Sequence, residues 1–238
     1  MPISFETIQS IAAQKHYVKH NYFRPKSSPL LYAHFRVMRP ILKLNNKRLL
    51  RKWKDAPIPW MTPAAIDILN AILTPDLKGF EFGSGRSTLF IAPRVEELVS
   101  LEHDVAWYQY ISEELMKRSL NNVHYFLKPP ASEPSKTIGY PKNNYINYTM
   151  PRIPATCYTE YAAFIDQYED EEFDFIIIDG RARVECTQHA IPKLKKGGVL
   201  ILDNAERARY ASIHTMLRNW KSVFTTSGIT DTVFWIKP

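Results

Sequence analysis

Five short apolar segments alternate with helical segments from residue 79 onward, and this alternation constrains the fold more than any other feature of the chain. We predict strands over residues 79–82, 97–102, 122–127, 174–178 and 199–202. After its first residue, the fourth segment reads Phe-Ile-Ile-Ile, which is typical of a central parallel strand buried on both faces. Because helices of about a dozen residues separate the strands, right-handed crossovers must connect them. The pattern predicts an α/β fold with a parallel sheet covered by helices on both sides.

The end of the chain carries a different signal. Helices are expected over 158–168, 185–194 and 208–220, with Gly197-Gly198 ending the second of them before the next strand. Residues 222–226 and 232–236, on either side of Gly228, predict a hairpin. The hairpin brings antiparallel pairing to one edge, so we expect a mostly parallel, seven-stranded sheet with an antiparallel C-terminal hairpin.

Positive charge is concentrated in the first 60 residues. They hold 12 Lys and Arg against Glu6 and Asp55, a net charge of +10, whereas the other 178 residues hold 19 basic and 22 acidic side chains, a net charge of −3. Residues 30–53 mix apolar and basic positions, and Pro40 predicts a break into two short amphipathic helices. We therefore divide the chain into a basic helical N-terminal extension, 1–60, and a Rossmann-like domain, 61–238. The extension either presents a solvated basic face or binds an anionic partner, a membrane surface or nucleic acid.

Cysteine content and hydropathy exclude several classes of protein. Cys157 and Cys186 are too few for a disulfide framework or a zinc cluster. No apolar run reaches the roughly 18 residues of a membrane span, and the N-terminus lacks the basic-then-apolar profile of a secretory signal. We expect a globular cytoplasmic protein, peripheral at a membrane surface if the extension binds one.

A long segment, 128–157, separates the third predicted strand from its helix. It holds six prolines and three tyrosines: Pro129, Pro130, Pro134, Pro141, Pro151, Pro154, Tyr140, Tyr145 and Tyr148. A loop of this length inside a compact domain is a lid, a binding loop or a disordered segment. Because the aromatic residues argue against complete disorder, we expect a lid.

Polar residues stand at the ends of four predicted strands: Glu81, Glu102, Asp179 and the pair Asp203-Asn204. Since parallel sheets bind ligands beyond the carboxyl ends of their strands, these side chains predict a site. The turn Gly83-Ser84-Gly85 adds the sharp bend and the close backbone approach that glycine permits. Glu102 follows Gly83 by 19 residues, about the spacing at which an acid meets the ribose hydroxyls of a bound nucleoside.

The same turn excludes two other classes of nucleotide site. A nicotinamide dinucleotide fingerprint would have a third glycine where Thr88 stands, and the chain contains no Gly-Lys-Ser/Thr phosphate loop. The turn therefore favours a nucleoside-bearing cofactor with little phosphate.

Four segments, in register, resemble the class I S-adenosylmethionine-dependent methyltransferases, in particular their O-methyltransferase-like branch. They are Glu81–Gly85, Ser100–Asp104, Phe173–Gly180 and Leu194–Asn204. The resemblance extends over roughly residues 60–238 and includes the final hairpin. It implies a Rossmann-like fold, methyl transfer as the activity and S-adenosylmethionine as the cofactor. The chain departs from the family at Ser87, where a third glycine is usual, and at Leu127–Pro129, where members place a polar residue toward adenine.

The resemblance also implies roles for individual residues. The cofactor would contact Glu81, Phe82, Gly83, Ser84, Gly85, Glu102, His103 and Asp179. Glu102 would hold the ribose, and His103 or Trp107 would lie near the adenine. Asp179 would also be the catalytic residue, at the place where the methyl group meets its acceptor. Arg181, Asp203 and Asn204 are the expected substrate contacts.

Asp179, Asp203 and Asn204 also resemble the ligand set of metal-dependent O-methyltransferases. Two aspartates and an asparagine supply the oxygen ligands that Mg²⁺ prefers, and the ion would lower the pKa of an acceptor hydroxyl. The family lysine shortly after the first aspartate is absent here, with only Arg181 and Arg183 nearby. Both a Mg²⁺ site and a metal-free site therefore stay open from the sequence.

The expected activity is transfer of a methyl group to an oxygen of a small-molecule or glycan-like acceptor. One alternative is a nucleic-acid methyltransferase that uses the basic extension for phosphate contacts, although the Asp/Asn-Pro-Pro-Tyr signature for base amino groups is missing. Another is a catalytically silent module that binds an anionic membrane surface.

Overall fold

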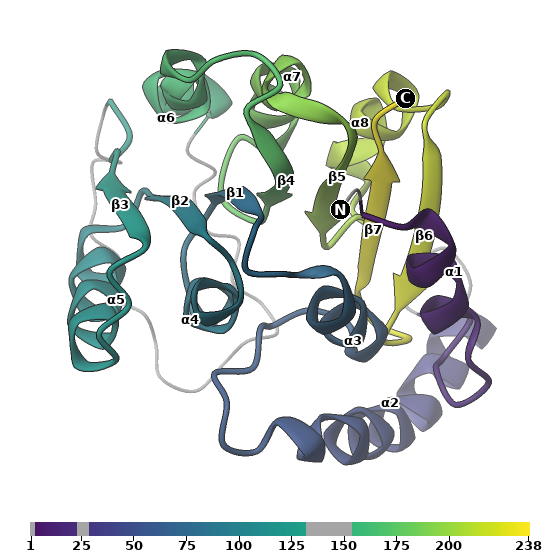
Figure 1. Cartoon of the computed structure of the whole chain (residues 1–238). Helices are drawn as coiled ribbons and strands as arrows, with labels where there is room; N and C mark the ends of the chain where they lie inside the picture. The colour runs from purple at the N-terminus through teal and green to yellow at the C-terminus, as the bar shows by residue number, and fades with distance from the viewer. Residues whose placement is uncertain (1–2, 23–28, 132–153) are drawn as a thin grey trace.

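A seven-stranded sheet forms the centre of the protein in our computed structural model, which describes residues 3–22, 29–131 and 154–238 (Figure 1). Its strands are β1 (Lys78–Phe82), β2 (Glu97–Glu102), β3 (Val123–Leu127), β4 (Phe173–Ile178), β5 (Leu194–Asp203), β6 (Lys221–Thr226) and β7 (Asp231–Ile236). They lie in the order β3-β2-β1-β4-β5-β7-β6. The first five strands pair in parallel, and β7 lies antiparallel between β5 and β6. The predicted Rossmann-like, mostly parallel sheet with an antiparallel hairpin is therefore confirmed.

Helices cover both faces of this sheet, because its central strands are apolar on both sides. Phe175 and Ile177 of β4 pack on one face, together with residues of α1 (Phe5–Ala13), α3 (Pro63–Ile72) and α4 (Arg86–Ile91). Ile176 and Ile178 pack on the other face, with residues of α6 (Thr159–Ala163), α7 (Arg183–Lys193) and α8 (Ala211–Met216). The helix α5 (Val105–Lys117) lies beside β3, where Ile111 and Leu115 are buried.

Helix starts follow the capping residues in the sequence. Thr62 caps α3, its Oγ1 accepting a hydrogen bond from the amide of Ala65 at 3.2 Å, and Pro63 occupies the first helical position. Asp104 caps α5 through the amide of Trp107 at 2.9 Å. The cap at Asp104 therefore starts α5 directly after the end of β2.

Two predicted helices are shorter than expected. The segment expected as a helix over 158–168 contains α6 between the 3₁₀ turns Ala155–Tyr158 and Phe164–Gln167. The segment 208–220 contains a 3₁₀ turn, Ala208–Tyr210, followed by α8.

Gly197 and Gly198 do not lie outside β5, as predicted, but within it. Leu194 pairs with Phe173 and Val199 with Phe175, so the segment between Leu194 and Val199 bulges out of the pairing. Gly197 has φ +75°, and a Cβ at Gly198 would lie 2.9 Å from the carbonyl oxygen of Asp174. The glycines therefore permit a bulge and do not end the strand.

The predicted break at Pro40 is wrong. A single helix, α2 (Pro29–Leu50), runs through Pro40 and continues into a 3₁₀ turn, Arg51–Trp53. Phe35 and Leu42 lie two turns apart on one face and are both buried, so each half of the helix is anchored on the same side. Pro40 itself is exposed, and burial of this shared face outweighs the one backbone hydrogen bond that a proline removes.

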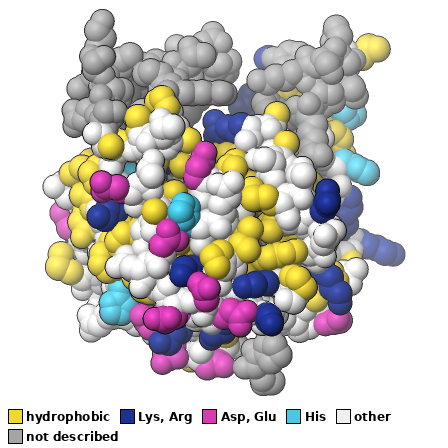
Figure 2. All heavy atoms as spheres, turned by 90° about the horizontal axis from the view of Figure 1, so that it is seen from above, with side chains coloured by type: hydrophobic (Ala, Val, Ile, Leu, Met, Phe, Trp, Pro, Cys, Tyr) yellow, Lys and Arg dark blue, Asp and Glu magenta, His cyan; other side chains and the backbone are white. Residues whose placement is uncertain are grey.

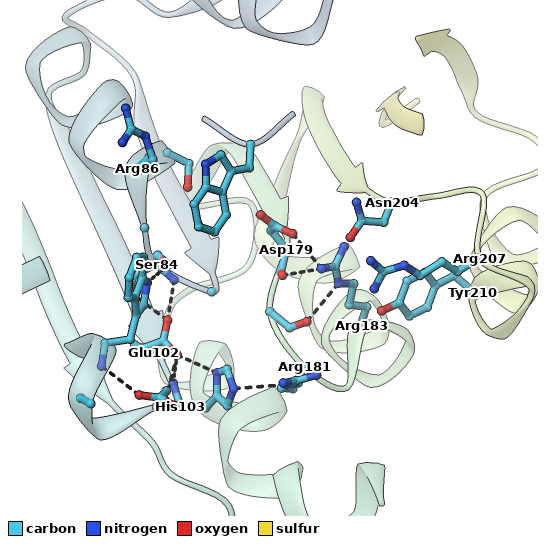
Figure 3. A pocket seen from close by; sticks show the side chains of 18 of the residues that line it. Ser84, Arg86, Glu102, His103, Asp179, Arg181, Arg183, Asn204, Arg207 and Tyr210 are labelled. Carbon is cyan, nitrogen blue, oxygen red and sulfur yellow. Dashed lines mark hydrogen bonds and ion pairs between the residues drawn. The ribbon is translucent and has the colours of Figure 1, made fainter. Parts of the chain in front are cut away.

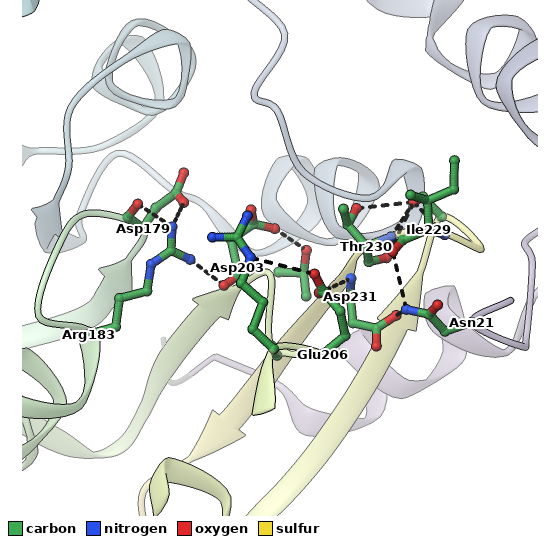
Figure 4. A network of polar contacts seen from close by, with 12 residues as sticks. Asn21, Asp179, Arg183, Asp203, Glu206, Ile229, Thr230 and Asp231 are labelled. Atoms are coloured by element: carbon green, nitrogen blue, oxygen red, sulfur yellow. Dashed lines mark hydrogen bonds and ion pairs between the residues drawn. The ribbon is translucent and has the colours of Figure 1, made fainter. Parts of the chain in front are cut away.

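The N-terminal extension packs against the body of the molecule. Ile8 of α1 is fully buried against α3 and β6. Leu42 of α2 contacts the hairpin turn at Gly228. Gly228 has φ +84°, and a side chain at this position would collide with Leu42. The amide of Tyr22 donates to the carbonyl of Gly228 at 2.9 Å, and Asn21 donates to Asp231 at 2.7 Å (Figure 4). The extension is thus tied to the β6–β7 hairpin.

The charge of the main body is mixed. On the face shown in Figure 2, Lys and Arg side chains lie interspersed with Asp and Glu side chains. Most of the proline- and tyrosine-rich segment, residues 132–153, lies outside the described residues, so the predicted lid does too. Among the described helices, none is long and apolar enough to span a membrane.

The contact between the extension and the hairpin can be tested within a single helix. Leu42→Ala removes a side chain that is 3% exposed, and we expect it to lower the free energy of unfolding by roughly 2–4 kcal/mol. Leu44→Ala, two residues along and 68% exposed, is the matched control and should change it by about 0.5 kcal/mol or less. Denaturant titration measures both values. Equal effects would show that α2 does not contribute to the folded core.

Candidate functional site

A pocket of about 620 Å³ opens beyond the carboxyl ends of β1, β2, β4 and β5 (Figure 3). The wall that we call the glycine-turn wall contains Gly83, Ser84, Gly85, Arg86, Ser87, Glu102, His103, Asp104, Ala106 and Trp107. Its arginine-rich wall contains Asp179, Gly180, Arg181, Arg183, Asn204, Arg207, Arg209 and Tyr210, and Trp60 also lines the pocket. The four predicted strand ends therefore meet around one cavity.

The floor of the pocket depends on two glycines. Gly83 follows β1 with φ +92°, and a Cβ on it would lie 2.6 Å from the backbone nitrogen of Gly180, which follows β4. A Cβ on Gly180 would collide with the hydroxyl of Tyr161. Only residues without a side chain let these two backbones approach so closely.

The amides of the glycine turn all donate within the protein. The amide of Gly83 donates to the carbonyl of Leu101 at 2.8 Å, that of Ser84 to Glu102 Oε2 at 3.1 Å, and that of Gly85 to Thr88 Oγ1 at 2.9 Å. The turn is therefore held in shape by its own neighbours. These three amides are therefore not free to donate to a ligand in the pocket.

Glu81 and Phe82 lie behind the pocket and are not part of its wall. Both are fully buried, and Glu81 Oε2 accepts hydrogen bonds from Thr88 Oγ1 at 2.5 Å and from Ser100 Oγ at 2.9 Å. Burial raises the pKa of Glu81 to about 7, against the lowering effect of hydrogen bonds from Ser87, Thr88 and Ser100. Because Thr88 Oγ1 also accepts the Gly85 amide, Glu81 supports the turn from inside the sheet.

Glu102 is the carboxylate that reaches the pocket. Oε2 accepts the amide and the hydroxyl of Ser84, at 3.1 and 2.9 Å. Oε1 accepts the amides of His103 and Asp104, at 2.7 and 2.9 Å. Burial would raise the pKa of Glu102, but the hydrogen bonds and charge of His103 and the backbone amides outweigh it and lower the pKa below its usual value. Glu102 is therefore ionised at neutral pH.

His103 connects the two walls of the pocket. Its Nδ1 lies 2.7 Å from Glu102 Oε1, and its Nε2 accepts a hydrogen bond from Arg181 Nε at 3.2 Å (Figure 3). The ring also packs edge-on against Tyr158 and Tyr161. His103 thus contacts one residue of each wall through its two ring nitrogens.

Aromatic side chains border the glycine-turn wall. Trp107 donates from Nε1 to the carbonyl of Ser84 at 2.8 Å and stacks on Trp60, with ring centroids 6.3 Å apart. Trp60 is 77% exposed. The hydroxyl of Tyr125 lies 2.5 Å from Ser84 Oγ. A flat ligand group can stack at this border.

On the arginine-rich wall, Asp179 forms an ion pair with Arg183. Asp179 Oδ1 lies 2.7 Å from Arg183 Nη2, which also donates to the carbonyl of Asp179 at 2.5 Å. Arg183 donates further to the carbonyls of Gly180 and Asp203 (Figure 4). Burial raises the pKa of Asp179, and the positive charges of Arg183 and Arg207 oppose that rise.

The three residues proposed as Mg²⁺ ligands do not form a metal site. The guanidinium of Arg183 occupies the position between Asp179 and the end of β5 where the ion would bind. Asp203 is 2% exposed and is not part of the pocket wall; its Oδ1 accepts a hydrogen bond from Thr232 Oγ1 at 2.8 Å, and burial raises its pKa to about 8. Asn204, with φ +50°, does line the pocket. Within residues 3–22, 29–131 and 154–238, no cluster of three His, Cys, Asp or Glu residues could hold a metal ion.

The structure brings most of the sequence-predicted residues together and adds others. Gly83, Ser84, Gly85, Glu102, His103, Asp179, Arg181 and Asn204 all line the pocket, whereas Glu81, Phe82 and Asp203 lie behind it. Sequence reasoning missed Trp60, Arg86, Arg207, Arg209 and Tyr210. Arg207 and Tyr210 follow closely after Asp203-Asn204, and this position was the signal that could have identified them. We had assigned Arg207 to a connection and Tyr210 to a helix.

Solved structures with the same arrangement of strands include several methyltransferases. A methyltransferase-like protein from Silicibacter pomeroyi is 20% identical, with a TM-score of 0.55, and the match covers 77% of this chain and 90% of that one. The chain has the Rossmann-like methyltransferase fold. A Staphylococcus aureus protein assigned as a caffeoyl-CoA O-methyltransferase is 15% identical, with a TM-score of 0.52 and coverage of 87% and 100%. A Streptococcus mutans protein assigned as a methyltransferase, crystallised with S-adenosylhomocysteine, is 11% identical, with a TM-score of 0.50 and coverage of 72% and 94%.

No protein-family model and no curated protein sequence matches the chain. At these identities, the solved structures establish the fold and leave the reaction to be inferred from the site.

The buried carboxyl of Glu81 makes a specific pH dependence testable. Its folded pKa of about 7 lies above the ordinary 4.5, so the carboxyl stabilises the fold fully below about pH 4.5 and loses that contribution as the pH rises through 7. Between about pH 5 and 8, the wild-type free energy of unfolding should fall by roughly 2 kcal/mol more than that of Glu81→Gln. Denaturant titrations at both pH values measure this, and the titration of Asp203, common to both proteins, cancels. Parallel pH profiles would contradict the assignment.

Proposed function

We propose that the protein is an S-adenosylmethionine-dependent methyltransferase that acts on an oxygen of a small-molecule or glycan-like acceptor. The observation that carries the proposal is the position of Glu102, an ionised carboxylate at the end of β2, directly beneath the glycine turn after β1. The fold is shared with a protein crystallised with S-adenosylhomocysteine. The cavity volume also lies within the roughly 300–1,000 Å³ of small-molecule sites.

The hydrogen bonds of Glu102 fit a ribose. Each carboxylate oxygen contacts one side-chain donor that can move away, Ser84 Oγ on Oε2 and His103 Nδ1 on Oε1, while the backbone donors stay. The two hydroxyls of a ribose could replace these side-chain donors, one on each oxygen. Released in this way, Ser84 Oγ keeps a partner in the hydroxyl of Tyr125, 2.5 Å away.

The arginine-rich wall suits an acceptor that carries negative charge. Arg183 is committed to Asp179, but Arg181, Arg207 and Arg209 have exposed guanidinium groups along the pocket. Among the described residues, their nearest carboxylate contact is Glu206, 3.8 Å from Arg207 Nε. Guanidinium groups bind phosphate and carboxylate through paired hydrogen bonds. We therefore place an anionic group of the acceptor against this wall.

The protein contributes alignment and proton transfer to this reaction. When bound, S-adenosylmethionine would supply an electrophilic methyl group on a sulfonium for transfer to the acceptor oxygen. Asp179, between the two walls, would accept the proton that the acceptor hydroxyl loses, and burial already raises its pKa toward that task. Arg181, Arg207 and Arg209 would fix the acceptor, while the preformed turn and the aromatic border would hold the cofactor and exclude water.

Calorimetry with S-adenosylhomocysteine tests the cofactor site. We expect wild-type protein to bind it and Glu102→Ala to bind it roughly a hundredfold more weakly, because two charge-assisted hydrogen bonds to the ribose are lost. Glu97→Gln, at the opposite end of β2, removes a carboxylate outside the pocket and should bind like wild type. Thermal unfolding checks that both variants are folded. If folded wild-type protein does not bind S-adenosylhomocysteine, the proposal is rejected. The remaining alternative is then a binding module that takes no cofactor.

Turnover on a panel of hydroxylated acceptors tests the arginine-rich wall. Acceptors that carry a phosphate or carboxylate should react faster than their uncharged analogues, and turnover should persist in EDTA because Arg183 stands where a metal would bind. Replacing Arg207 and Arg209 together by Gln should raise KM for charged acceptors at least tenfold and leave S-adenosylhomocysteine affinity unchanged. Preference for uncharged acceptors, or loss of activity in EDTA, would overturn this assignment of the wall.

A further inference from the structure

One face of α2 is apolar although nothing in the described structure packs on it. Leu30, Val37, Ile41 and Leu44 are 83%, 67%, 56% and 68% exposed. They recur at the spacing of one helix face and lie opposite Phe35 and Leu42, the residues that anchor α2 to the body. We call these four exposed residues the apolar row. In Figure 1, α2 runs along the outside of the molecule, beyond α3.

A row of basic residues runs along one side of the apolar row. Arg36, Lys43 and Lys47 are exposed at positions one and two turns apart on the helix. Arg48 and Arg51 extend the positive charge toward the end of the helix, and both are exposed. Residues 29–54 contain no Asp or Glu, so no acidic side chain of this segment balances the charge. The nearby Lys52 differs, since it pairs with Asp67 of α3.

Three kinds of partner could cover the apolar row and the basic row together, and one of them fits both rows. A second copy of the chain would bring two basic rows together, and like charges would oppose that contact. Nucleic acid would satisfy the basic row but would leave the apolar row in water. The surface of an anionic bilayer satisfies both, because acyl chains accept the apolar side chains while lipid phosphates attract the basic ones.

We propose that α2 lies in the plane of an anionic membrane surface and holds the protein there through the apolar row and the basic row. The helix is attached to the methyltransferase fold by Leu42, which contacts the hairpin turn at Gly228, and by the hydrogen bond from Asn46 Nδ2 to the carbonyl of Ser227 at 3.1 Å. Membrane binding through α2 would therefore hold the pocket near the surface without inserting any part of the sheet. The proposal concerns α2 alone and does not depend on the reaction at the pocket.

Co-sedimentation of the full chain with vesicles tests the proposal. We expect binding to phosphatidylcholine vesicles that contain roughly a third phosphatidylglycerol, little binding to phosphatidylcholine alone, and weakening with added salt. Val37→Gln/Ile41→Gln/Leu44→Gln removes most of the apolar row, and Arg36→Gln/Lys43→Gln/Lys47→Gln removes the basic row. Each triple variant should weaken binding at least tenfold. All six positions point to solvent, so folding is preserved, and thermal unfolding checks this.

A matched control separates the basic row from total charge. Lys117→Gln/Arg118→Gln/Lys196→Gln also removes three exposed positive charges, but away from α2, and should change binding less than threefold. The proposal fails if this control weakens binding as much as the α2 variants, or if the apolar variant binds like wild type. It also fails if vesicles are not bound while RNA binding, or a dimer seen by light scattering, is lost in the α2 variants. S-adenosylhomocysteine affinity, measured on the same samples, reports separately on the proposed methyltransferase site.

Discussion

The close approach of two backbones, at Gly83 after β1 and Gly180 after β4, is the contact on which the pocket depends. The parallel pairing of β1 with β4 brings the two turns together, and the absence of a Cβ on either residue lets them touch. This contact sets the positions of the two walls of the cavity relative to each other. Glu102 reaches the turn from β2 on one side, and Asp179 and Arg183 follow β4 on the other. A side chain at either glycine would separate the walls that the proposed reaction must bring together.

Four buried or partly buried carboxyls near this contact have different partners, and their partners decide their chemistry. Glu102 receives four hydrogen bonds from neighbouring donors and is held ionised. Glu81 and Asp203 face the interior with hydroxyl partners, and burial raises their pKa values to about 7 and about 8. Burial raises the pKa of Asp179, and its ion pair with Arg183 opposes that rise. Of these four carboxyls, Glu102 is held ionised at the pocket, and the guanidinium of Arg183 lies between Asp179 and the end of β5.

The N-terminal extension is part of the folded unit and also the carrier of its positive charge. Ile8, Phe35 and Leu42 are buried, while the opposite face of α2 remains open to solvent. One helix is thus divided into an anchored face and a free face, and the free face is the one that we propose for membrane attachment. The methyltransferase fold and its extension would then act together on an acceptor that is itself anionic and close to a membrane.

Local periodicity allowed the sequence alone to predict the strands, their parallel pairing, the hairpin and the glycine turn. These features depend on neighbouring residues, and the ends of parallel strands must meet at one edge. The directions of long side chains were decided only in the tertiary structure. Glu81 stands between Phe80 and Phe82 and so points to the opposite face of β1, toward Ser100 and Thr88. Asp203 at the end of β5 pairs with Thr232 of the neighbouring strand β7, and Arg183 fills the space that three separate oxygen ligands had suggested for a metal. Pro40 interrupts hydrogen bonding but not α2, because Phe35 and Leu42 are buried by parts of the chain that no local pattern could reveal.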